Sequence, residues 1–326
     1  MISKTKYIFI LFAIIPHFLI SSNLFGEKQN WGEIELATIT ESSGLVASQQ
    51  NNNLFWTHND SGDKNRIYCF DNTGNHRAIY YLHNSKARDW EDMTIGPGPI
   101  KNKEYLYVAD IGDNIAKHRT KYVYRFEEPK ISSSKVKIID TIYNVDKIMF
   151  EYPDGKFDAE TIMLDPHTKD IFILTKRQKE IRIYGLDFPQ EIDKVITAKF
   201  YGTFDLYPDF DSINKLRYIS AGSISSNGEN ILIKSYIDVF HINRYDGQTI
   251  PEALMKNEKH IVNYEIEPQG EAICWHPNDF GYFTLSEENN DNPAYLYFYP
   301  VVNGCMDNSA INYNPYSTIP NRSCKY

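Results

Sequence analysis

Hydrophobic and polar positions alternate over short distances along most of the chain. Apolar runs of roughly four to eight residues recur, and clusters of Asn, Asp, Gly and Pro separate them. The spacing of apolar residues typical of an amphipathic helix is nearly absent. Many short strand-like runs bounded by turn residues are typical of all-β domains. The pattern therefore predicts an all-β fold.

The strand-like runs form a weak repeat of five units. The first run of each unit places small or acidic residues before an apolar segment: "SSGLVAS" at 42–48, "WEDMTIGP" at 90–97, "AETIMLDP" at 159–166, "AGSISSNG" at 221–228 and "GEAICWHP" at 270–277. A second run follows in every unit: "LFWTHNDSG", "YLYVADIGDN", "DIFILTKRQ", "NILIKSY" and "GYFTLSEEN". A third run comes next: "RIYCF", "YVYRF", "IRIYGL", "DVFHI" and "AYLYFY". Repeats of one sheet-sized unit indicate a radial or stacked β architecture.

A fourth run completes four of the five units: "RAIYYLH", "KIIDTIY", "ITAKFYG" and "HIVNYEI". The fifth unit lacks one, but the strand-like segment "WGEIELATI" at 31–39 precedes the first unit. A strand donated by the N-terminus would close a ring of four-stranded blades and leave no exposed sheet edge at the junction. We therefore predict a five-bladed β-propeller over residues 28–302. Six blades are the alternative, because the second unit is long and "KIMFEYPDG" at 147–155 could form an extra strand.

The N-terminus resembles a targeting segment rather than part of the fold. The basic stretch "MISKTK" precedes the apolar run "YIFILFAIIPHFLI", and small residues follow in "SSNLFGE". This order predicts a signal peptide over residues 1–26, with an uncleaved anchor as the alternative. The apolar run is short for a membrane span. We expect a protein that is secreted, periplasmic or on the cell surface, without a stable membrane span once the signal peptide is removed.

Composition and net charge limit the classes of molecule that the protein is expected to bind. Hydrophobic residues make up 42% of the chain and charged ones 24%, as in ordinary globular proteins. The formal net charge of −9 argues against nucleic acid as a partner, because phosphate backbones require a basic face. We expect a monomer that binds a small molecule or a surface component.

The four cysteines divide into two kinds. Cys305 and Cys324 lie in a distinct tail, residues 304–326, and are expected to form a disulfide in an oxidising compartment. Cys69 and Cys274 lie inside apolar strand-like runs and are expected to be buried free thiols. The chain contains neither CxxC nor HExxH, so the sequence gives little support for a zinc site.

Five oxygen-bearing residues are expected to converge on the propeller axis, because the first strand of each blade lines the central channel. These residues are Ser43, Glu91, Glu160, Ser223 and Glu271, and Asp89 belongs to the same spoke as Glu91. Converging carboxylates repel one another unless a cation lies among them. Ligands that are all oxygens suit Ca²⁺ before Mg²⁺, so we predict a calcium site. A water-filled channel without metal is the alternative, and in the fourth unit Gly222 could take the place of Ser223.

The loops after the second strands open toward the same face of the propeller. They carry His58, Asn59, Asp60, Asp110, Asp113, Asn114, Lys176, Arg177, Lys234 and Glu287, and another loop adds Arg88. Ordinary turn chemistry accounts for many Asx and Gly residues in such loops. A functional interpretation assigns ligand binding to Arg88, Asp60, Asp113, Lys234 and Glu287.

The candidates for catalysis at this face are His58, Asp110, Lys176 and Arg177. His58 or Asp110 would act as a general base on water, and the basic groups suit a phosphorylated or carboxylated ligand beside a divalent ion. The segment "AGSIS" is not GxSxG, and no other nucleophile signature is present.

Two resemblances add to this picture. The motifs "ESSGL", "WEDM", "AETI", "AGSI" and "GEAI" resemble the Ser/Glu/Glu/Ser/Glu axial pattern of the calcium-activated nucleotidase (apyrase) family. That resemblance implies a five-bladed propeller with axial Ca²⁺ bound by the five residues above, and hydrolysis of nucleoside di- and triphosphates. The segments "WTHNDSG", "RDWEDMTIGPG" and "YLYVADIGDN" are similar to uncharacterised secreted bacterial propeller proteins, which imply no activity.

The tail "GCMDNSAINYNPYSTIPNRSCKY" is similar to a Cys-bounded repeat, GC-x-D-x-x-A-x-N-Y-N-P, that is appended to secreted bacterial proteins. This resemblance implies a small disulfide-closed module for surface attachment.

The sequence leaves two functions open. The first is a propeller that holds calcium in its channel and binds a ligand at the channel mouth without catalysis. The alternative is an apyrase-like, calcium-dependent hydrolase of phosphate esters or anhydrides, with a lactonase or glycosidase as more distant possibilities. Propellers perform both kinds of role, so the fold does not decide between them.

Overall fold

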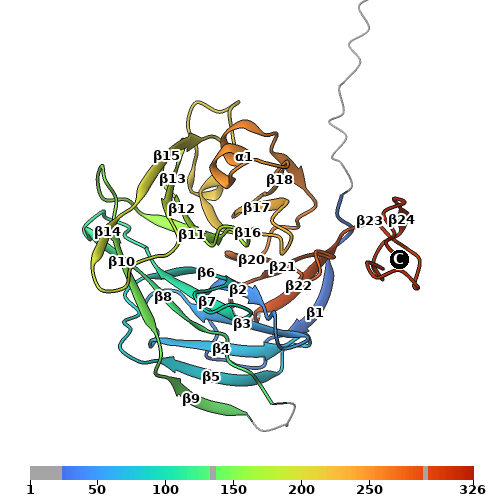
Figure 1. Ribbon diagram of the computed structural model, residues 1–326, viewed down its shortest axis with the longest axis horizontal. Helices are drawn as coiled ribbons and strands as arrows, with labels where there is room; N and C mark the ends of the chain where they lie inside the picture. Colours follow the sequence, from blue (N-terminus) through green and yellow to red (C-terminus); the bar gives the residue numbers. More distant parts are fainter. Residues whose placement is uncertain (1–23, 133–136, 289–292) are drawn as a thin grey trace, which may run out of the picture.

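The computed structural model describes residues 24–132, 137–288 and 293–326. Five sheets surround a central axis as the blades of a propeller (Figure 1). The predicted five-bladed all-β fold is confirmed, and the six-bladed alternative is wrong.

Each blade is one sheet, whose strands follow one another from the channel outward. Blade 1 contains β2 (Ser42–Ala47), β3 (Leu54–Asn59), β4 (Arg66–Asp71), β5 (His76–Leu82) and β9 (Ile138–Ile142). Blade 2 contains β6 (Trp90–Pro97), β7 (Glu104–Asp110), β8 (Thr120–Glu127), β10 (Asp146–Glu151) and β14 (Val195–Thr197). Blade 3 contains β11 (Ala159–Leu164), β12 (Ile171–Thr175), β13 (Ile181–Leu186) and β15 (Lys199–Phe204). Blade 4 contains β16 (Ile219–Ile224), β17 (Asn230–Ser235), β18 (Val239–Asn243) and β19 (His260–Val262). Blade 5 contains β20 (Ala272–Trp275), β21 (Gly281–Leu285), β22 (Tyr295–Pro300) and β1 (Gln29–Glu33).

The N-terminus closes the ring as predicted. Strand β1 pairs antiparallel with β22, although it begins two residues before the predicted segment and ends at Glu33. Phe25, which lies within the predicted signal peptide, is 1% exposed and packs among Trp275 and Tyr282. The folded body therefore includes residues from Leu24 onward, whereas the rest of the predicted signal peptide lies outside the described residues.

Two predicted fourth strands belong to other places in the ring. The segment "KIIDTIY" forms β9, which extends blade 1 by pairing parallel with β5. The fourth strand of blade 2 is β10, the segment considered for a sixth blade; its Ile148 and Phe150 are buried in the core between blades 2 and 3. The segment "ITAKFYG" is divided between β14, which pairs parallel with β10, and β15, which completes blade 3. The added parallel strands cover sheet edges that would otherwise be open.

The hydrophobic core is divided into five layers, one between each pair of neighbouring blades. The inner strands β2, β6, β11, β16 and β20 contact one another in ring order, and β20 returns to β2. Two short helices, η1 (Lys215–Arg217) and α1 (Ile250–Lys256), lie outside the sheets. No helix in the described ranges has both the length and the apolar character needed to cross a membrane.

The C-terminal tail forms a small module beside blade 5 (Figure 1). Strands β23 (Asn303–Gly304) and β24 (Ile319–Pro320) pair in parallel, and the predicted Cys305–Cys324 disulfide is confirmed. Cys69 and Cys274 are buried free thiols, as expected.

Candidate metal centre at the channel mouth

A β-bulge at the start of each of four inner strands displaces one residue from the sheet ladder. The displaced residues are Ser43 in β2, Glu91 in β6, Glu160 in β11 and Ser220 in β16. Glu271 precedes β20 at the corresponding place in blade 5. A bulge turns a side chain away from the alternating faces of the sheet, which explains how five inner strands direct polar groups toward one end of the channel.

The strand register corrects one predicted position. Ser220, and not Ser223, takes the bulge position of blade 4. Two hydrogen bonds support this equivalence: the Ser43 hydroxyl donates to the backbone oxygen of Glu91, and the Ser220 hydroxyl donates to that of Glu271 at 3.0 Å. Ser223 lies three residues further along the strand, and its hydroxyl accepts a hydrogen bond from the Trp275 backbone.

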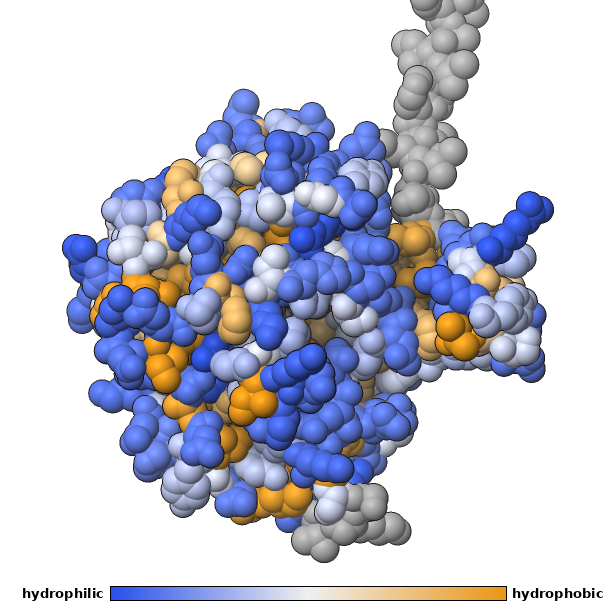
Figure 2. Space-filling model, in the orientation of Figure 1, coloured by the Kyte–Doolittle hydropathy of each residue, from blue (hydrophilic) through white to orange (hydrophobic). Residues whose placement is uncertain are grey.

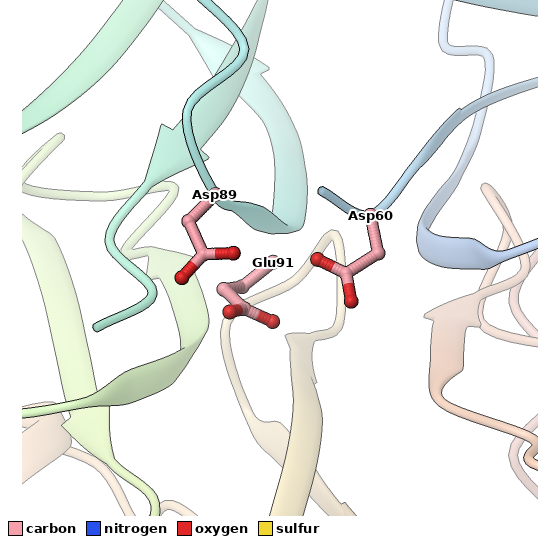
Figure 3. A group of neighbouring side chains, drawn as sticks. All are labelled: Asp60, Asp89 and Glu91. Atoms are coloured by element: carbon pink, nitrogen blue, oxygen red, sulfur yellow. The ribbon is translucent and has the colours of Figure 1, made fainter. Parts of the chain in front are cut away.

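Carboxylates gather at this mouth in two overlapping groups. Asp60, Asp89 and Glu91 have carboxylate oxygens within 4.8 Å of one another, and so do Glu91, Asp158 and Glu160. Figure 3 shows the side chains of Asp60 and Asp89 directed toward Glu91, which lies between them. Glu91 therefore links the two groups, and we call the combined set the carboxylate cluster: Asp60, Asp89, Glu91, Asp158 and Glu160.

Burial and mutual repulsion make ionisation of Asp60, Glu91 and Glu160 unfavourable. Burial raises the pKa of Glu160 to about 8, despite the nearby Lys176, and the charge of Glu271 contributes. Burial and the neighbouring Glu160 also raise the pKa of Glu91 well above its ordinary value. Burial and the charges of Glu271 and Asp89 raise the pKa of Asp60 to about 7. These groups can all be ionised near neutral pH only if a positive charge lies among them.

One oxygen of the carboxylate cluster has no partner. Glu160 is 2% exposed; its Oε1 accepts a hydrogen bond from Lys176 Nζ at 2.5 Å, whereas its buried Oε2 has no hydrogen bond among the described residues. Lys176 also donates to the Tyr236 hydroxyl at 3.3 Å, and Tyr236 donates to Glu271 Oε1 at 2.5 Å. The lysine thus neutralises one side of the cluster. The Glu160 carboxyl group also faces that of Glu91, and the two can hydrogen-bond to each other only when one of them is protonated.

The backbone is fitted closely around these carboxylates. A Cβ atom at Gly112 would lie 1.9 Å from Glu91 Oε1 and 2.5 Å from Asp89 Oδ2. Asp92 has a different role from its neighbours, since its two oxygens accept from the backbone of Met93 and of Ile162 in the next inner strand. In the segment "RDWEDM", Asp89 and Glu91 therefore form the cluster, and Asp92 joins blades 2 and 3.

Several residues predicted at the mouth are occupied with structural contacts instead. His58 is buried, its Nδ1 lies 2.9 Å from the Asn59 carbonyl oxygen, and burial lowers its pKa to about 4. Lys234 is buried and donates to the carbonyl oxygens of Ser235 and Gly270. Neither side chain reaches solvent, because each points between neighbouring blades.

Two further predicted residues form ion pairs below the mouth. Asp110 is buried, and its Oδ1 lies 3.3 Å from Nε of Arg88; burial raises the pKa of Asp110 to about 6. Asp113 pairs with buried Lys121 at 3.1 Å and accepts from the Lys117 backbone nitrogen, which holds the loop.

Glu287 and Arg177 remain at the mouth. Burial and the charge of Glu271 raise the pKa of Glu287 to about 9, and Gln269 donates to its Oε2 at 2.9 Å. Arg177 Nε lies 2.6 Å from Asp158 Oδ2.

A basic pocket adjoins the carboxylate cluster. It has a volume of about 400 Å³ and includes Lys176, Arg177 and the exposed Lys215, with Tyr218 and Tyr236 as aromatic walls. Sequence reasoning missed Tyr236, Asp158 and Ser220. An alignment of "SAG" at 220–222 with "SGL" at 43–45 and "EDM" at 91–93 would have indicated Ser220. The positions of Asp158 and Tyr236 depend on how the loops fold.

The fold and this mouth define a five-bladed β-propeller with a buried carboxylate cluster at one end of its channel. No family model matches the sequence, and no curated protein matches it.

Solved structures with a similar chain trace include a luciferin-regenerating enzyme, with 9% identity, a TM-score of 0.45 and coverage of 84% of this chain and 94% of that one. Kuenenia stuttgartiensis hydrazine synthase has 11% identity, a TM-score of 0.39 and coverage of 76% and 68%. The Cps50 (Swd1) β-propeller domain of Myceliophteria thermophila has 10% identity, a TM-score of 0.41 and coverage of 85% and 99%. Likenesses at this level carry no inference about function.

Proposed function

We propose that the protein is a propeller that binds a divalent cation, calcium, at the channel mouth and uses this face to hold an anionic ligand without catalysis. The observation that carries the proposal is the buried carboxylate pair of Glu91 and Glu160. Oε2 of Glu160 accepts no hydrogen bond from a described residue while Glu91 is ionised, and the two carboxyl groups can hydrogen-bond only when one of them is protonated. A buried carboxylate oxygen without a hydrogen bond is costly, and a cation among oxygen ligands would offset that cost.

The proposed ligands of the cation are Glu91 and Glu160, with further oxygens available from Asp60, Asp89 and Asp158. All of these donors are carboxylate oxygens, which suits a hard cation such as Ca²⁺. Ser43 and Glu271 lie at equivalent positions of the ring, where they border the site. Ser223 is not included, because its hydroxyl lies further along the inner strand.

The basic pocket supports the choice of an anionic ligand. Lys215 forms no ion pair with another described residue, and it lies in the same pocket as Arg177. Lysine and arginine beside a divalent cation favour a carboxylated or phosphorylated group. The same observation favours the second candidate function, calcium-dependent hydrolysis of phosphate esters or anhydrides. The buried positions of His58 and Asp110 leave that candidate without either predicted general base at the mouth.

The cellular location is part of the proposal. The Cys305–Cys324 disulfide supports an oxidising compartment. We propose that the protein acts outside the cytosol, as a secreted, periplasmic or cell-surface protein.

Calorimetric titration with Ca²⁺ and Mg²⁺ tests the cation site. The wild-type protein is expected to bind calcium at one site, and Glu160→Gln is expected to weaken binding at least about tenfold. Glu265→Gln, which alters an exposed carboxylate in the segment between β19 and β20, is the control and should bind as the wild type does. Absence of calcium binding at millimolar concentration would reject the cation site. Phosphate release from nucleotides and phosphate esters, with and without EGTA, then separates the binding function from the hydrolase.

A further inference from the structure

A second cavity lies at the opposite end of the propeller, between blades 1 and 5. It is lined by residues from the end of β2, the start of β3 and the end of β20, whereas the carboxylate cluster lies at the starts of the inner strands. Its volume of about 410 Å³ falls in the range of small-ligand sites. Because the two sites are at opposite ends, conclusions about one do not depend on the other.

The disulfide-closed module supplies one wall of this cavity. The centroid of the Tyr316 ring lies 5.0 Å from that of the Phe298 ring of blade 5 and 6.3 Å from that of the Trp31 ring. Backbone hydrogen bonds fix the module in place, including Thr318 N to Val302 O at 2.9 Å. Figure 2 shows hydrophobic residues at the junction between the module and the propeller body. The module is therefore docked, and we call the cavity the module groove.

The lining of the module groove contains aromatic rings and side-chain amides. The aromatic groups are Trp31, Phe55, His276, Phe280, Phe283 and Tyr316, and the amides are those of Gln49, Asn52, Asn53 and Asn278. The His276 ring lies 5.1 Å from that of Phe280, and burial lowers the pKa of His276 to about 4, so the imidazole is neutral at physiological pH.

Charged side chains are missing from this lining. None of the described residues that border the groove is Asp, Glu, Lys or Arg, although 24% of the chain is charged. The amides of Gln49, Asn52 and Asn278 are exposed and donate no hydrogen bond to another described residue. They offer both donors and acceptors to a bound molecule.

We propose that the module groove binds a neutral, linear oligosaccharide, with the Cys-bounded module as a structural part of the binding site. A pyranose ring presents C–H faces that pack on aromatic rings, and its hydroxyl groups at the rim pair with amides. An anionic ligand would need a cationic side chain to offset its charge, and the groove supplies none among its described residues. A purely apolar ligand would leave the amides without partners.

The test uses the chain from residue 24 to residue 326, which includes the Cys-bounded module, and a panel of neutral hexasaccharides. The panel contains β-1,4-glucose, α-1,4-glucose, β-1,3-glucose, β-1,4-xylose, β-1,4-mannose and β-1,4-N-acetylglucosamine hexamers, with a galacturonic acid hexamer as the anionic comparison. Calorimetry measures affinity, and the change in tryptophan fluorescence reports contact with Trp31. At least one neutral hexamer is expected to bind, and the anionic hexamer is expected to bind more weakly.

Three variants locate the binding site. Tyr316→Ala is expected to raise the Kd at least about tenfold, whereas Tyr316→Phe, which keeps the ring, stays within about threefold of the wild type. Tyr245→Ala removes an exposed tyrosine of blade 4, outside the groove, and should leave the Kd unchanged. Circular dichroism verifies that each variant is folded, and calcium affinity should be the same in all of them.

The proposal is overturned if none of the neutral hexamers binds, or if the anionic hexamer binds more tightly. It is also overturned if Tyr316→Ala binds as the wild type does, or if Tyr245→Ala loses binding to the same degree. Binding of an unrelated panel of uncharged peptides in preference to the saccharides would assign the groove to another ligand class and reject the proposal.

Discussion

Substitution of Gly112 by alanine tests the cation site without removing any carboxylate. The new Cβ would lie 1.9 Å from Glu91 Oε1, whereas ordinary contacts begin near 3.4 Å. Glu91 would have to move by about 1.5 Å, far more than the roughly 0.2 Å by which metal–ligand distances vary. Asp89 Oδ2, at 2.5 Å from the same atom, would be displaced as well. We expect Gly112→Ala to lose most of its calcium affinity.

Thermal unfolding with calcium or with EDTA measures the effect. Binding of calcium as proposed is expected to stabilise the wild-type fold by about 2.7 kcal/mol when calcium is at 100 times its Kd. For a chain of this size that corresponds to an increase in Tm of about 4 °C. Overpacking at Gly112 costs about 1–3 kcal/mol even without calcium. The readout is therefore the calcium-induced increase in Tm, which should nearly vanish, and not the absolute Tm.

Gly96→Ala is the matched control. It lies on the inner strand β6, which also carries Glu91, but its new Cβ would meet a Leu164 methyl group at 2.7 Å and no carboxylate. We expect a lower Tm with the full calcium-induced increase. If Gly112→Ala retains that increase while its stability falls, Glu91 and Asp89 do not surround the cation, and the reasoning about the carboxylate cluster is refuted.

Three further predictions concern stability, each measured by urea unfolding. Burial lowers the pKa of His241 from 6.5 to about 4. Between these two pKa values the unfolded chain binds more protons than the folded one, so the free energy of unfolding falls as pH falls. Between pH 8 and pH 5 the wild type should lose about 2 kcal/mol of stability that His241→Gln does not lose. An equal pH dependence in both proteins would show that His241 titrates normally. The buried Glu128 of blade 2 accepts hydrogen bonds from Ser48 and, at 2.8 Å, from Trp56 of blade 1. Glu128→Ala should cost about 3 kcal/mol and Glu128→Gln clearly less, and equal losses would argue against these hydrogen bonds. Phe25→Ala should cost about 3–5 kcal/mol, because Phe25 is 1% exposed; a change below about 1 kcal/mol would place residue 25 outside the folded body.

The pattern of short runs in the sequence was enough to predict the blades. Most strands have their own apolar segment, and turn residues separate them, so the number of blades follows from local preference, although blades 1 and 2 each contain one strand more than the predicted four. The ring closure by β1 was also predictable, because the fifth unit lacks a fourth strand of its own. The Cys305–Cys324 disulfide was predictable because both cysteines lie in one short tail. Of the five predicted axial residues, Ser43, Glu91, Glu160 and Glu271 lie at or directly before the starts of inner strands, whereas their binding of a cation stays a prediction.

Tertiary structure alone decided where the outer strands pair and which polar groups meet. The partner of β9 depends on which sheet edge lies nearby, and alternation within the strand does not encode it. Ser220, and not Ser223, takes the bulge position at the start of β16, and this bulge is defined only by the pairing of β16 with β17. The burial of His58 and Lys234, and the meeting of Tyr316 with Trp31, arise from contacts between segments far apart in the chain. Local sequence fixes the preference of each segment for a strand, but the position of a side chain relative to distant segments is determined only when the blades pack together.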